Sequence, residues 1–203
     1  MPTTESAPQT GADPANATRR AGLVSVASRL FRERGYHAVG MRAIAEAASM
    51  QAASLYHHFR NKEEILLEAI FVVDRDLIFD QLPLLGRPGS CRERLVRVLR
   101  GHVLHIGHNR DAWWVASREL RALSPEKLES VQHYRRQYQN AIAELIAEGV
   151  RAGEFACEDP MLVTAAILDM INGLNVWYTP NGRYTIDELA DRYSALAAQL
   201  VTA

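Results

Sequence analysis

The chain has 203 residues, of which 48% are hydrophobic and 23% are charged, a composition that supports a folded core and excludes disorder over most of its length. The formal net charge of -1 would by itself argue against a nucleic-acid-binding protein. However, residues 1–62 hold eight Arg and Lys against four Asp and Glu, whereas the remainder holds fifteen against twenty, so the first third alone is suited to an anionic partner.

The first segment to carry a helical pattern follows an irregular start. Residues 1–17 are rich in Pro, Thr, Ala and Gly without an apolar period, which predicts a flexible tail. A helix is then predicted from Thr18 to Arg34, with Gly35 as its left-handed stop. Its predicted core-facing residues are Leu23, Val26, Ala27, Leu30 and Phe31.

The run 41–59, MRAIAEAASMQAASLYHHF, predicts two short helices joined by a tight turn. The first has an apolar face at Ile44, Ala45 and Ala48, and the second has one at Ala52, Leu55 and Phe59. These faces would pack against each other, with Leu55 and Phe59 in the core. Polar groups would then point outward, as in a helix-turn-helix.

The second of these helices has the dimensions and side chains for reading DNA. At ~1.5 Å per residue it would be about 10 Å long, and the major groove is ~12 Å wide. Small side chains could lie against thymine methyl groups, while longer ones could pair with bases or bond phosphates. The predicted base-reading residues are Arg42, Gln51, Ala52 and Ala53, the predicted phosphate-binding residues are Ser54, Tyr56 and Lys62, and His57 could take either role.

The rest of the chain is divided into helices by caps and breakers. Asn61 is predicted to cap a long helix with Glu64 as its reciprocal partner, and the segment 83–89 to end that helix. Further helices are predicted from Cys91 to Asn109, from Ser124 to about Arg151, from Asp159 to about Tyr178, and from Thr185, with Glu188 closing a capping box, to Leu200. Since no run of alternating β-branched residues occurs, we expect an all-α fold of about nine helices.

Two features bear on compartment and membrane. Cys91 and Cys157 lack CxxC spacing, and the N-terminus reads as no secretory signal, so we expect a cytoplasmic protein. The most apolar stretch, 161–178, is interrupted by Asp169, Asn172 and Asn175. We therefore expect a buried helix there and no membrane partner.

Three histidines, His102, His105 and His108, recur at i, i+3 and i+6 on one predicted helix. Adjacent pairs could bind one metal ion, but the three side chains spread over an arc of about 120° around the helix, which disfavours binding by all three. Histidines near a helix C-terminus are more often present for dipole or packing reasons. We predict no metal and no cofactor.

The body of the chain offers candidate dimer and ligand surfaces. One recognition helix reads too few base pairs, so a two-fold dimer on a palindromic operator in double-stranded DNA is expected. An apolar stripe on the last helix, together with the apolar face of 161–178, could pair with its symmetry mate or could only close the monomer core. The stripe residues are Ile186, Leu189, Tyr193, Leu196 and Leu200.

Aromatic and polar residues at mostly helical spacings between residues 91 and 178 could line a cavity for a small molecule, or could be ordinary packing. The candidate ligand-binding residues are Trp113, Trp114, Tyr134, Tyr138, Asn172, Asn175 and Trp177.

Four motifs resemble the TetR (tetracycline-repressor) family of bacterial transcriptional regulators: FRERG at 31–35, IAEAA from Ile44, SLYHHF at 54–59 and NKEEIL at 61–66. The resemblance is specific over residues 20–70. It implies a helix-turn-helix DNA-binding domain at 18–62 and a ligand-binding and dimerisation domain at 63–203. By this match every predicted DNA-binding residue except Gln51 falls on a DNA-contacting position of the family. Gly40, Ser49 and Gln51 replace the family's usual polar cap, turn glycine and Ser or Thr.

We therefore expect a repressor that binds a palindromic operator as a homodimer and is released by a small, hydrophobic or acyl-bearing effector.

One alternative is a helical hydrolase that uses the three histidines with Asp111 or Glu119. The absence of a nucleophile elbow, a phosphate loop and HExxH opposes it. Another alternative is a DNA-binding protein without ligand control. We predict no enzymatic activity.

Overall fold

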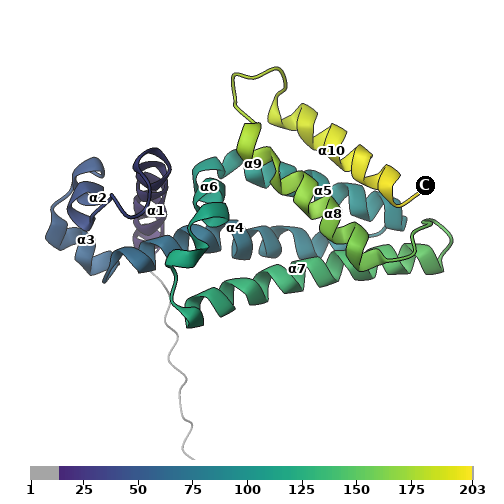
Figure 1. The fold of residues 1–203 in the computed structure, drawn as a ribbon, viewed down its shortest axis with the longest axis horizontal. Coiled ribbons are helices and arrows are strands. Elements are labelled where there is room, and N and C mark those ends of the chain that lie inside the picture. Colours follow the sequence, from purple (N-terminus) through teal and green to yellow (C-terminus); the bar gives the residue numbers. More distant parts are fainter. Residues whose placement is uncertain (1–13, 203) are drawn as a thin grey trace, which may run out of the picture.

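Helices form all the regular secondary structure of residues 14–202, the part of the chain that this computed structural model describes (Figure 1). Residues 1–13 of the predicted tail lie outside it. The elements are α1 (Pro14–Arg34), α2 (Met41–Ala47), α3 (Ala52–His58), α4 (Lys62–Leu85), α5 (Cys91–His108), α6 (Arg110–Arg118), the 3-10 turn η1 (Leu120–Ala122), α7 (Pro125–Arg151), α8 (Pro160–Asn172), α9 (Leu174–Trp177) and α10 (Ile186–Leu200). The predicted all-α fold is confirmed.

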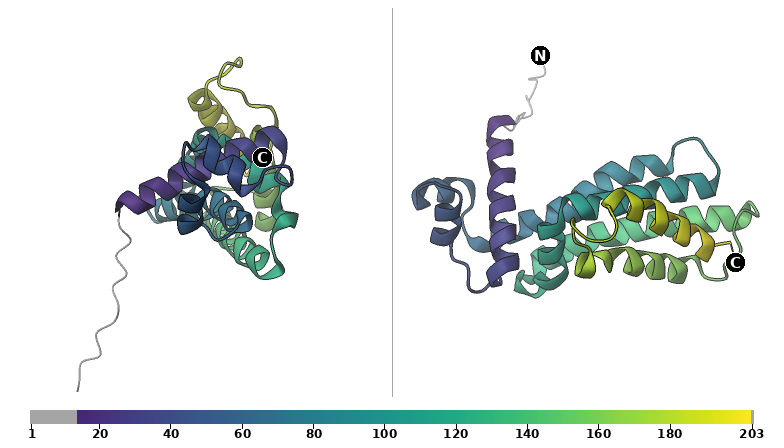
Figure 2. Two further views of the ribbon diagram at one scale, coloured as in Figure 1. Left: turned by 90° about the vertical axis from the view of Figure 1, so that its left-hand side faces the viewer. Right: turned by 90° about the horizontal axis from the view of Figure 1, so that it is seen from above.

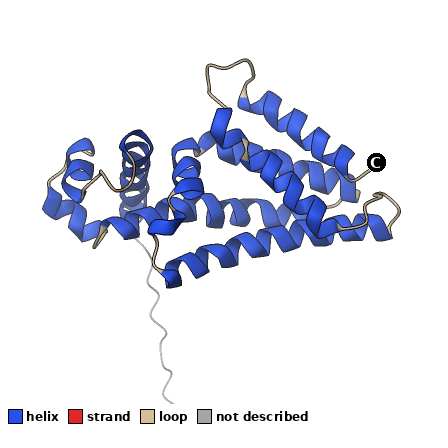
Figure 3. Cartoon of the chain, viewed as in Figure 1, coloured by secondary structure: helices blue, strands red, loops and turns tan. Residues whose placement is uncertain are grey.

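The helices form a small head and a larger body. Helices α1, α2 and α3 lie at one end, and α4 runs from them into the body that α5 to α10 complete (Figure 1). Seen from the other two directions, α1 stands across the long axis of the body, and the C-terminus lies at the end away from the head (Figure 2). Figure 3 shows the loops that join these helices, most of them short. Helix α4 is thus the element that the two parts share.

Side-chain caps mark the starts of α4, α5, α8 and α10. The side chain of Thr185 accepts the N–H of Glu188 and the Glu188 carboxylate returns the bond, so the predicted capping box is confirmed. Asn61 caps α4 as predicted, with its side chain accepting the N–H of Glu64 at 2.9 Å. The predicted return bond is wrong, because the Glu64 carboxylate accepts the N–H of Arg60 instead.

Other boundaries differ from the sequence-based expectation. Helix α1 begins at Pro14 rather than Thr18, because proline is well suited to a first helical turn and the residues after it continue the helix. Helix α4 ends at Leu85, within the segment 83–89 that was predicted to end it, with Pro83 inside its last turn. The helix predicted over 159–178 is divided at Gly173 into α8 and α9. Helix α6, which follows α5 at Asn109, was not predicted as a separate element.

The body core contains close approaches of helix backbone to side chains at Gly101, Gly107 and Gly149. Helix α10 packs mainly along α5, and at Gly107 the two helices come so close that an added Cβ would lie 2.2 Å from Cγ1 of Ile186. Helix α1 offers a contrast, since an added Cβ at Gly22 would meet no atom within 4 Å.

We predict that Gly107→Ala destabilises the fold by about 1–3 kcal/mol, because the methyl group forces Ile186 and α10 off α5. Gly22→Ala is the matched control, and it should stabilise by roughly 0.5–1 kcal/mol through the higher helix propensity of alanine. Urea denaturation of the two variants measures both effects. Equal free energies of unfolding for the two variants would contradict the packing of α10 on α5.

Candidate nucleic-acid interface and ligand cavity

The helix-turn-helix forms as predicted. Ile44 of α2 and Leu55 and Phe59 at α3 are fully buried at 0% exposure, so the apolar faces of the two helices do pack inward. The turn between them includes Ser49, whose φ of 54° is in the left-handed region that usually favours glycine. This turn fixes the angle at which α3 leaves α2.

The outward surface of this unit carries most of the predicted DNA-binding residues. Tyr56 is 53% exposed despite its aromatic ring. The other exposed members are Arg42, Gln51, Ala53 and His57, while Ala52 and Ser54 are half-buried. Since Leu55 and Phe59 fill the core behind them, α3 presents one polar face at the end of the molecule. Their contacts with DNA remain a prediction.

Lys62 differs from the other predicted phosphate ligands. Its ammonium donates a 2.7 Å hydrogen bond to the carbonyl oxygen of Tyr36 and lies 4.2 Å from the centroid of that ring. Burial lowers the pKa of this lysine, against an opposing effect of Glu119. Lys62, the first residue of α4, therefore stabilises the loop between α1 and α2 through its contacts with Tyr36.

A positioning residue that the sequence analysis missed holds α3 in place. The Arg20 guanidinium donates to the carbonyl oxygen of His58 and lies 4.1 Å from the centroid of the Phe59 ring. The second terminal nitrogen of the same guanidinium lies 3.8 Å from the Glu68 carboxylate of α4. Arg20 thus connects α1 with the end of α3 and with α4.

The head is fastened to the body by ion pairs. The Arg32 guanidinium of α1 donates to the Asp111 carboxylate of α6 at 2.6 Å. At the start of α4, the Glu63 carboxylate accepts from the Lys127 ammonium at 2.9 Å and from the backbone N–H of Ser124 at 2.7 Å. Lys127 and Ser124 lower the pKa of Glu63 through these bonds. Asp111 therefore takes part in the ion pair that connects the head with the body.

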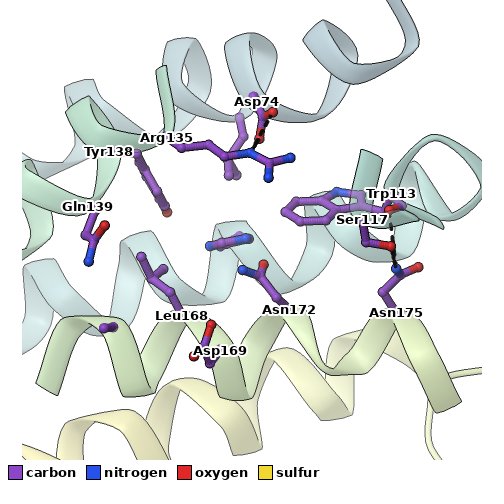
Figure 4. A pocket seen from close by; sticks show the side chains of 13 residues that line it. Asp74, Trp113, Ser117, Arg135, Tyr138, Gln139, Leu168, Asp169, Asn172 and Asn175 are labelled. Atoms are coloured by element: carbon purple, nitrogen blue, oxygen red, sulfur yellow. Dashed lines mark hydrogen bonds and ion pairs between the residues drawn. The ribbon is translucent and has the colours of Figure 1, made fainter. Parts of the chain in front are cut away.

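A cavity of about 260 Å³ lies in the body between α4, α5, α6, α7 and α8 (Figure 4). Its lining residues are Asp74, Leu77, His102, Trp113, Ser117, Arg135, Tyr138, Gln139, Ala165, Leu168, Asp169, Asn172 and Asn175. Side chains from three helices, Trp113, Tyr138 and Asn172, approach one space in Figure 4. The structure thus brings together four of the predicted ligand-binding residues, including Asn175.

An ion pair between buried Asp74 and partly exposed Arg135 forms one wall of this cavity. Arg135 Nε donates to both carboxylate oxygens of Asp74, at 3.0 and 3.1 Å, and Nη2 donates to the carbonyl oxygen of Ala116. Burial raises the pKa of Asp74 to about 6, against the opposing charge and hydrogen bond of Arg135. The sequence analysis missed this pair, although an aspartate among the apolar core positions of α4 was a signal for it.

Three polar side chains in the cavity have no hydrogen-bond partner within 3.5 Å among the described residues. They are the His102 imidazole, the Trp113 indole N–H and the Tyr138 hydroxyl, all buried. The imidazole lies between the two other rings, with centroid distances of 5.4 Å to each. Burial, with a smaller effect from His105, lowers the pKa of His102 to about 3, against the opposing effect of a weak side-chain hydrogen bond with Asn172. His102 is thus neutral at physiological pH.

Three of the candidate ligand-binding residues do not line the cavity. Trp114 follows Trp113 on α6 and so points about 100° away, where Arg118 lies over its ring. Tyr134 packs edge-on against Phe71. Trp177 is on the surface beside Tyr193. Helical spacing alone could not separate these residues from the cavity-lining ones.

The three histidines of α5 have different surroundings. His102 lies in the cavity, while His105 Nε2 is 3.1 Å from the carbonyl oxygen of Val72 and His108 is exposed. Within residues 14–202, no group of three or more His, Cys, Asp or Glu is placed to share a metal ion.

The predicted dimer stripe is divided between the core and the surface. Leu189 is buried against the body and Ile186 covers Gly107, so these two residues are already used within the chain. Tyr193 is half-buried, whereas Leu196 and Leu200 are 47% and 49% exposed. At about 100° per residue the five stripe residues lie within an arc of roughly 80°, and the buried face formed by Ala190, Ser194, Ala197 and Ala198 lies beside that arc.

The apolar segment 160–177 is long and apolar enough to cross a membrane by composition, yet α8 and α9 divide it at Gly173. The expectation that this segment is buried is wrong for the single chain, since 22% of it is buried. Its outer face is not covered by any other element of residues 14–202, which is the physical reason. The exposed large apolar residues on it are Met161, Leu162, Val176 and Trp177.

Comparison with known proteins matches both parts of the chain. The family of bacterial regulatory proteins called tetR matches residues 23–69, and the tetracyclin repressor-like C-terminal domain matches residues 88–201. The HTH-type transcriptional repressor KstR2 of Mycolicibacterium smegmatis (strain ATCC 700084 / mc(2)155) is 28% identical over 199 residues, which cover 97% of this chain and 96% of that protein.

Two solved structures are similar over most of their length. The TetR-family transcriptional regulator PfmR of Thermus thermophilus is 28% identical with a TM-score of 0.82, and covers 87% of this chain and 97% of its own. AibR, solved in complex with isovaleryl coenzyme A and operator DNA, is 26% identical with a TM-score of 0.76, and covers 88% of this chain and 97% of its own.

The neutral, buried state of His102 has a measurable consequence for stability. Its pKa is about 3 when folded and about 6.5 when unfolded, so the unfolded chain binds the extra proton between these values and stability falls as pH falls through this window. Replacing His102 by Phe keeps a ring and removes the titration. Between pH 7 and pH 5 the wild type should lose roughly 2 kcal/mol more than His102→Phe.

Denaturant titrations of both proteins at the two pH values measure this difference. Asp74, whose pKa is raised to about 6, titrates in the opposite direction, but its effect cancels when the two proteins are compared. An identical pH dependence in both would show that His102 is not buried as a neutral ring.

Proposed function

Because this chain belongs to the TetR family of bacterial regulatory proteins and is thus a transcriptional regulator, we propose that it is a repressor released by a small effector. In this proposal a homodimer binds a palindromic operator through α3 of each protomer. The single observation that carries it is the arrangement of α3, with Leu55 and Phe59 fully buried and Tyr56 exposed between them. A similar protein, KstR2, is a transcriptional repressor.

The recognition surface is suited to both base reading and phosphate binding. The small side chains Ala52 and Ala53 open α3, so the helix end can approach base edges closely. Arg42 at the start of α2 is exposed and could form two hydrogen bonds with a guanine. Gln51, Ser54, Tyr56 and His57 would supply further contacts. Lys62 would act indirectly, by holding the loop between α1 and α2.

A second protomer is required for useful specificity. Six of the large apolar side chains exposed in the described chain lie on α8, α9 and α10, which suits a self-complementary interface. Such an interface would present the two α3 helices to two half-sites about one helical turn apart, ~34–36 Å. Leu196 and Leu200 would lie at its centre, in place of the buried Leu189 of the predicted stripe.

The effector would act through helices that reach both the cavity and the head. Asp74 of α4 and Trp113 of α6 line the cavity, while α4 begins in the head and α6 holds Arg32 of α1 through Asp111. A ligand that favours a different packing of α4 and α6 would shift the dimer toward a spacing that no longer fits two half-sites. The apolar side chains of Leu77 and Leu168 suit a hydrophobic or acyl-bearing effector.

A gel shift with the DNA upstream of the chain's own gene tests this proposal. The protein should retard that DNA, and an extract that contains metabolites should release it. Retardation without release by any extract would indicate a DNA-binding protein without ligand control. Failure to retard any upstream DNA would contradict the proposal and favour the enzyme alternative.

Arg42→Ala should weaken operator binding by about 1–3 kcal/mol and relax the base preference at one position of each half-site. If Arg42 contacts phosphate instead, the slope of log affinity against log salt should flatten by ~0.9 per contact with unchanged sequence preference. Arg136→Ala is the matched control, since Arg136 is exposed on α7 and pairs with Glu129. Equal affinities for the two variants would exclude Arg42 from the interface.

Leu196→Asp should weaken dimerisation at least about tenfold, because it places an unpaired charge at the centre of an apolar interface. Phe79→Asp is the control, because Phe79 is also exposed but lies on α4, away from α8 and α10. Sedimentation equilibrium measures both. The proposed interface is wrong if Leu196→Asp remains dimeric or if Phe79→Asp dissociates as readily.

A further inference from the structure

We infer that the body cavity recognises an uncharged, oxygen-bearing fragment, a carbonyl or hydroxyl group on an otherwise apolar skeleton, through Tyr138, Trp113 and His102. This inference rests on the proposed function, in which the cavity is the effector site. It adds the chemical class of the part of the effector that enters the cavity.

The first support is the state of these three side chains. Each lies in the cavity wall with less than a tenth of its surface exposed, and its polar atoms have no hydrogen-bond partner within 3.5 Å among the described residues. Native proteins rarely leave buried polar groups unpaired, because each one loses its hydrogen bonds to water. Three such groups in one wall therefore indicate that the cavity binds something with hydrogen-bonding atoms of its own.

The second support is the donor and acceptor inventory. The Trp113 indole can only donate, the Tyr138 hydroxyl can donate or accept, and the neutral His102 imidazole offers one donor and one acceptor. Because both other rings lie 5.4 Å from the His102 ring, the groups surround one small region. A carbonyl oxygen, with two lone pairs, could accept from two of them, and a hydroxyl could also donate to the imidazole.

The third support is the charge of the wall. Among the described lining residues Arg135 is the one cation, and its guanidinium is already bonded to Asp74 and to the carbonyl oxygen of Ala116. Asp169 adds a carboxylate to the wall, where it would repel an anion. A carboxylate or phosphate would therefore be desolvated beside the three unpaired groups, where Asp74 already neutralises the one cation. Any charged part of the effector must remain outside the cavity.

The fourth support is size. The volume of about 260 Å³ is below the ~300–1,000 Å³ of typical ligand pockets. At ~30 Å³ per water-sized group it holds roughly nine such groups. Leu77 and Leu168 provide apolar surface for the skeleton. A saturated cyclic ketone with about nine non-hydrogen atoms, cyclooctanone, is therefore a suitable probe.

The test measures binding of four probes to the full-length protein by calorimetry: cyclooctanone, cyclooctanol, cyclooctane and cyclooctane carboxylate. The ketone and the alcohol should bind about tenfold more tightly than the hydrocarbon, since each gains hydrogen bonds to buried donors. The carboxylate should bind more weakly than the ketone. In Tyr138→Phe the preference for the ketone over the hydrocarbon should fall roughly five- to tenfold, with the hydrocarbon affinity unchanged.

Tyr134→Phe is the matched control. Tyr134 lies one helical turn before Tyr138 on α7 but packs on Phe71 outside the cavity, so this variant should keep the wild-type preference. Thermal unfolding without probe adds a second readout. Tyr138→Phe should unfold at or above the wild-type temperature, because it removes an unpaired hydroxyl.

The inference is overturned if no probe binds, if the hydrocarbon or the carboxylate binds as tightly as the ketone, or if Tyr138→Phe keeps the ketone preference. The gel shift separates this result from the proposed function. Operator binding without a ketone preference overturns only the cavity chemistry. A ketone preference in a protein that retards no upstream DNA overturns the proposed function and leaves the cavity chemistry in place.

Discussion

Helix α4 is the constraint on which the arrangement of this molecule depends. Its first residue, Lys62, holds the loop that leads into the helix-turn-helix, and three turns later Asp74 and Leu77 form part of the cavity wall. An α-helix is a stiff element, so the head and the cavity cannot move independently at this point. The ion pair between Arg32 and Asp111 adds a second connection through α6, which also carries Trp113 into the cavity. We propose that this double attachment transmits effector binding to α3.

The cavity is built at a cost to the stability of the body. Asp74 is buried while its partner Arg135 stays partly exposed, so the carboxylate leaves water at a cost that the ion pair only partly offsets. The unpaired groups of His102, Trp113 and Tyr138 add to that cost. Residues that reduce stability in this way and lie around one cavity are typical of a binding site. The head, as far as the structure describes it, has no such cluster, and its core is apolar.

The sequence predicted local features well and tertiary ones poorly. The helix-turn-helix followed from the spacing of Ile44, Leu55 and Phe59, and the last helix from the reciprocal caps Thr185 and Glu188, because these signals lie within a few residues of each other. Helix α6 lacks a capping hydrogen bond at its start, so no local signal predicted it after the helix that was expected to end at Asn109.

The cavity could be predicted only in part, because lining depends on how helices distant in sequence pack. Trp113 and Trp114 are neighbours of the same type, yet only the first lines the cavity. The partner of Asp74 is 61 positions away at Arg135.

The central claim is that the contact of α1 with α6 transmits effector binding to α3, and Arg32→Ala tests it by removing the ion pair with Asp111. The variant should bind its operator and resist release by an extract that releases the wild type; release of both proteins alike would contradict the account.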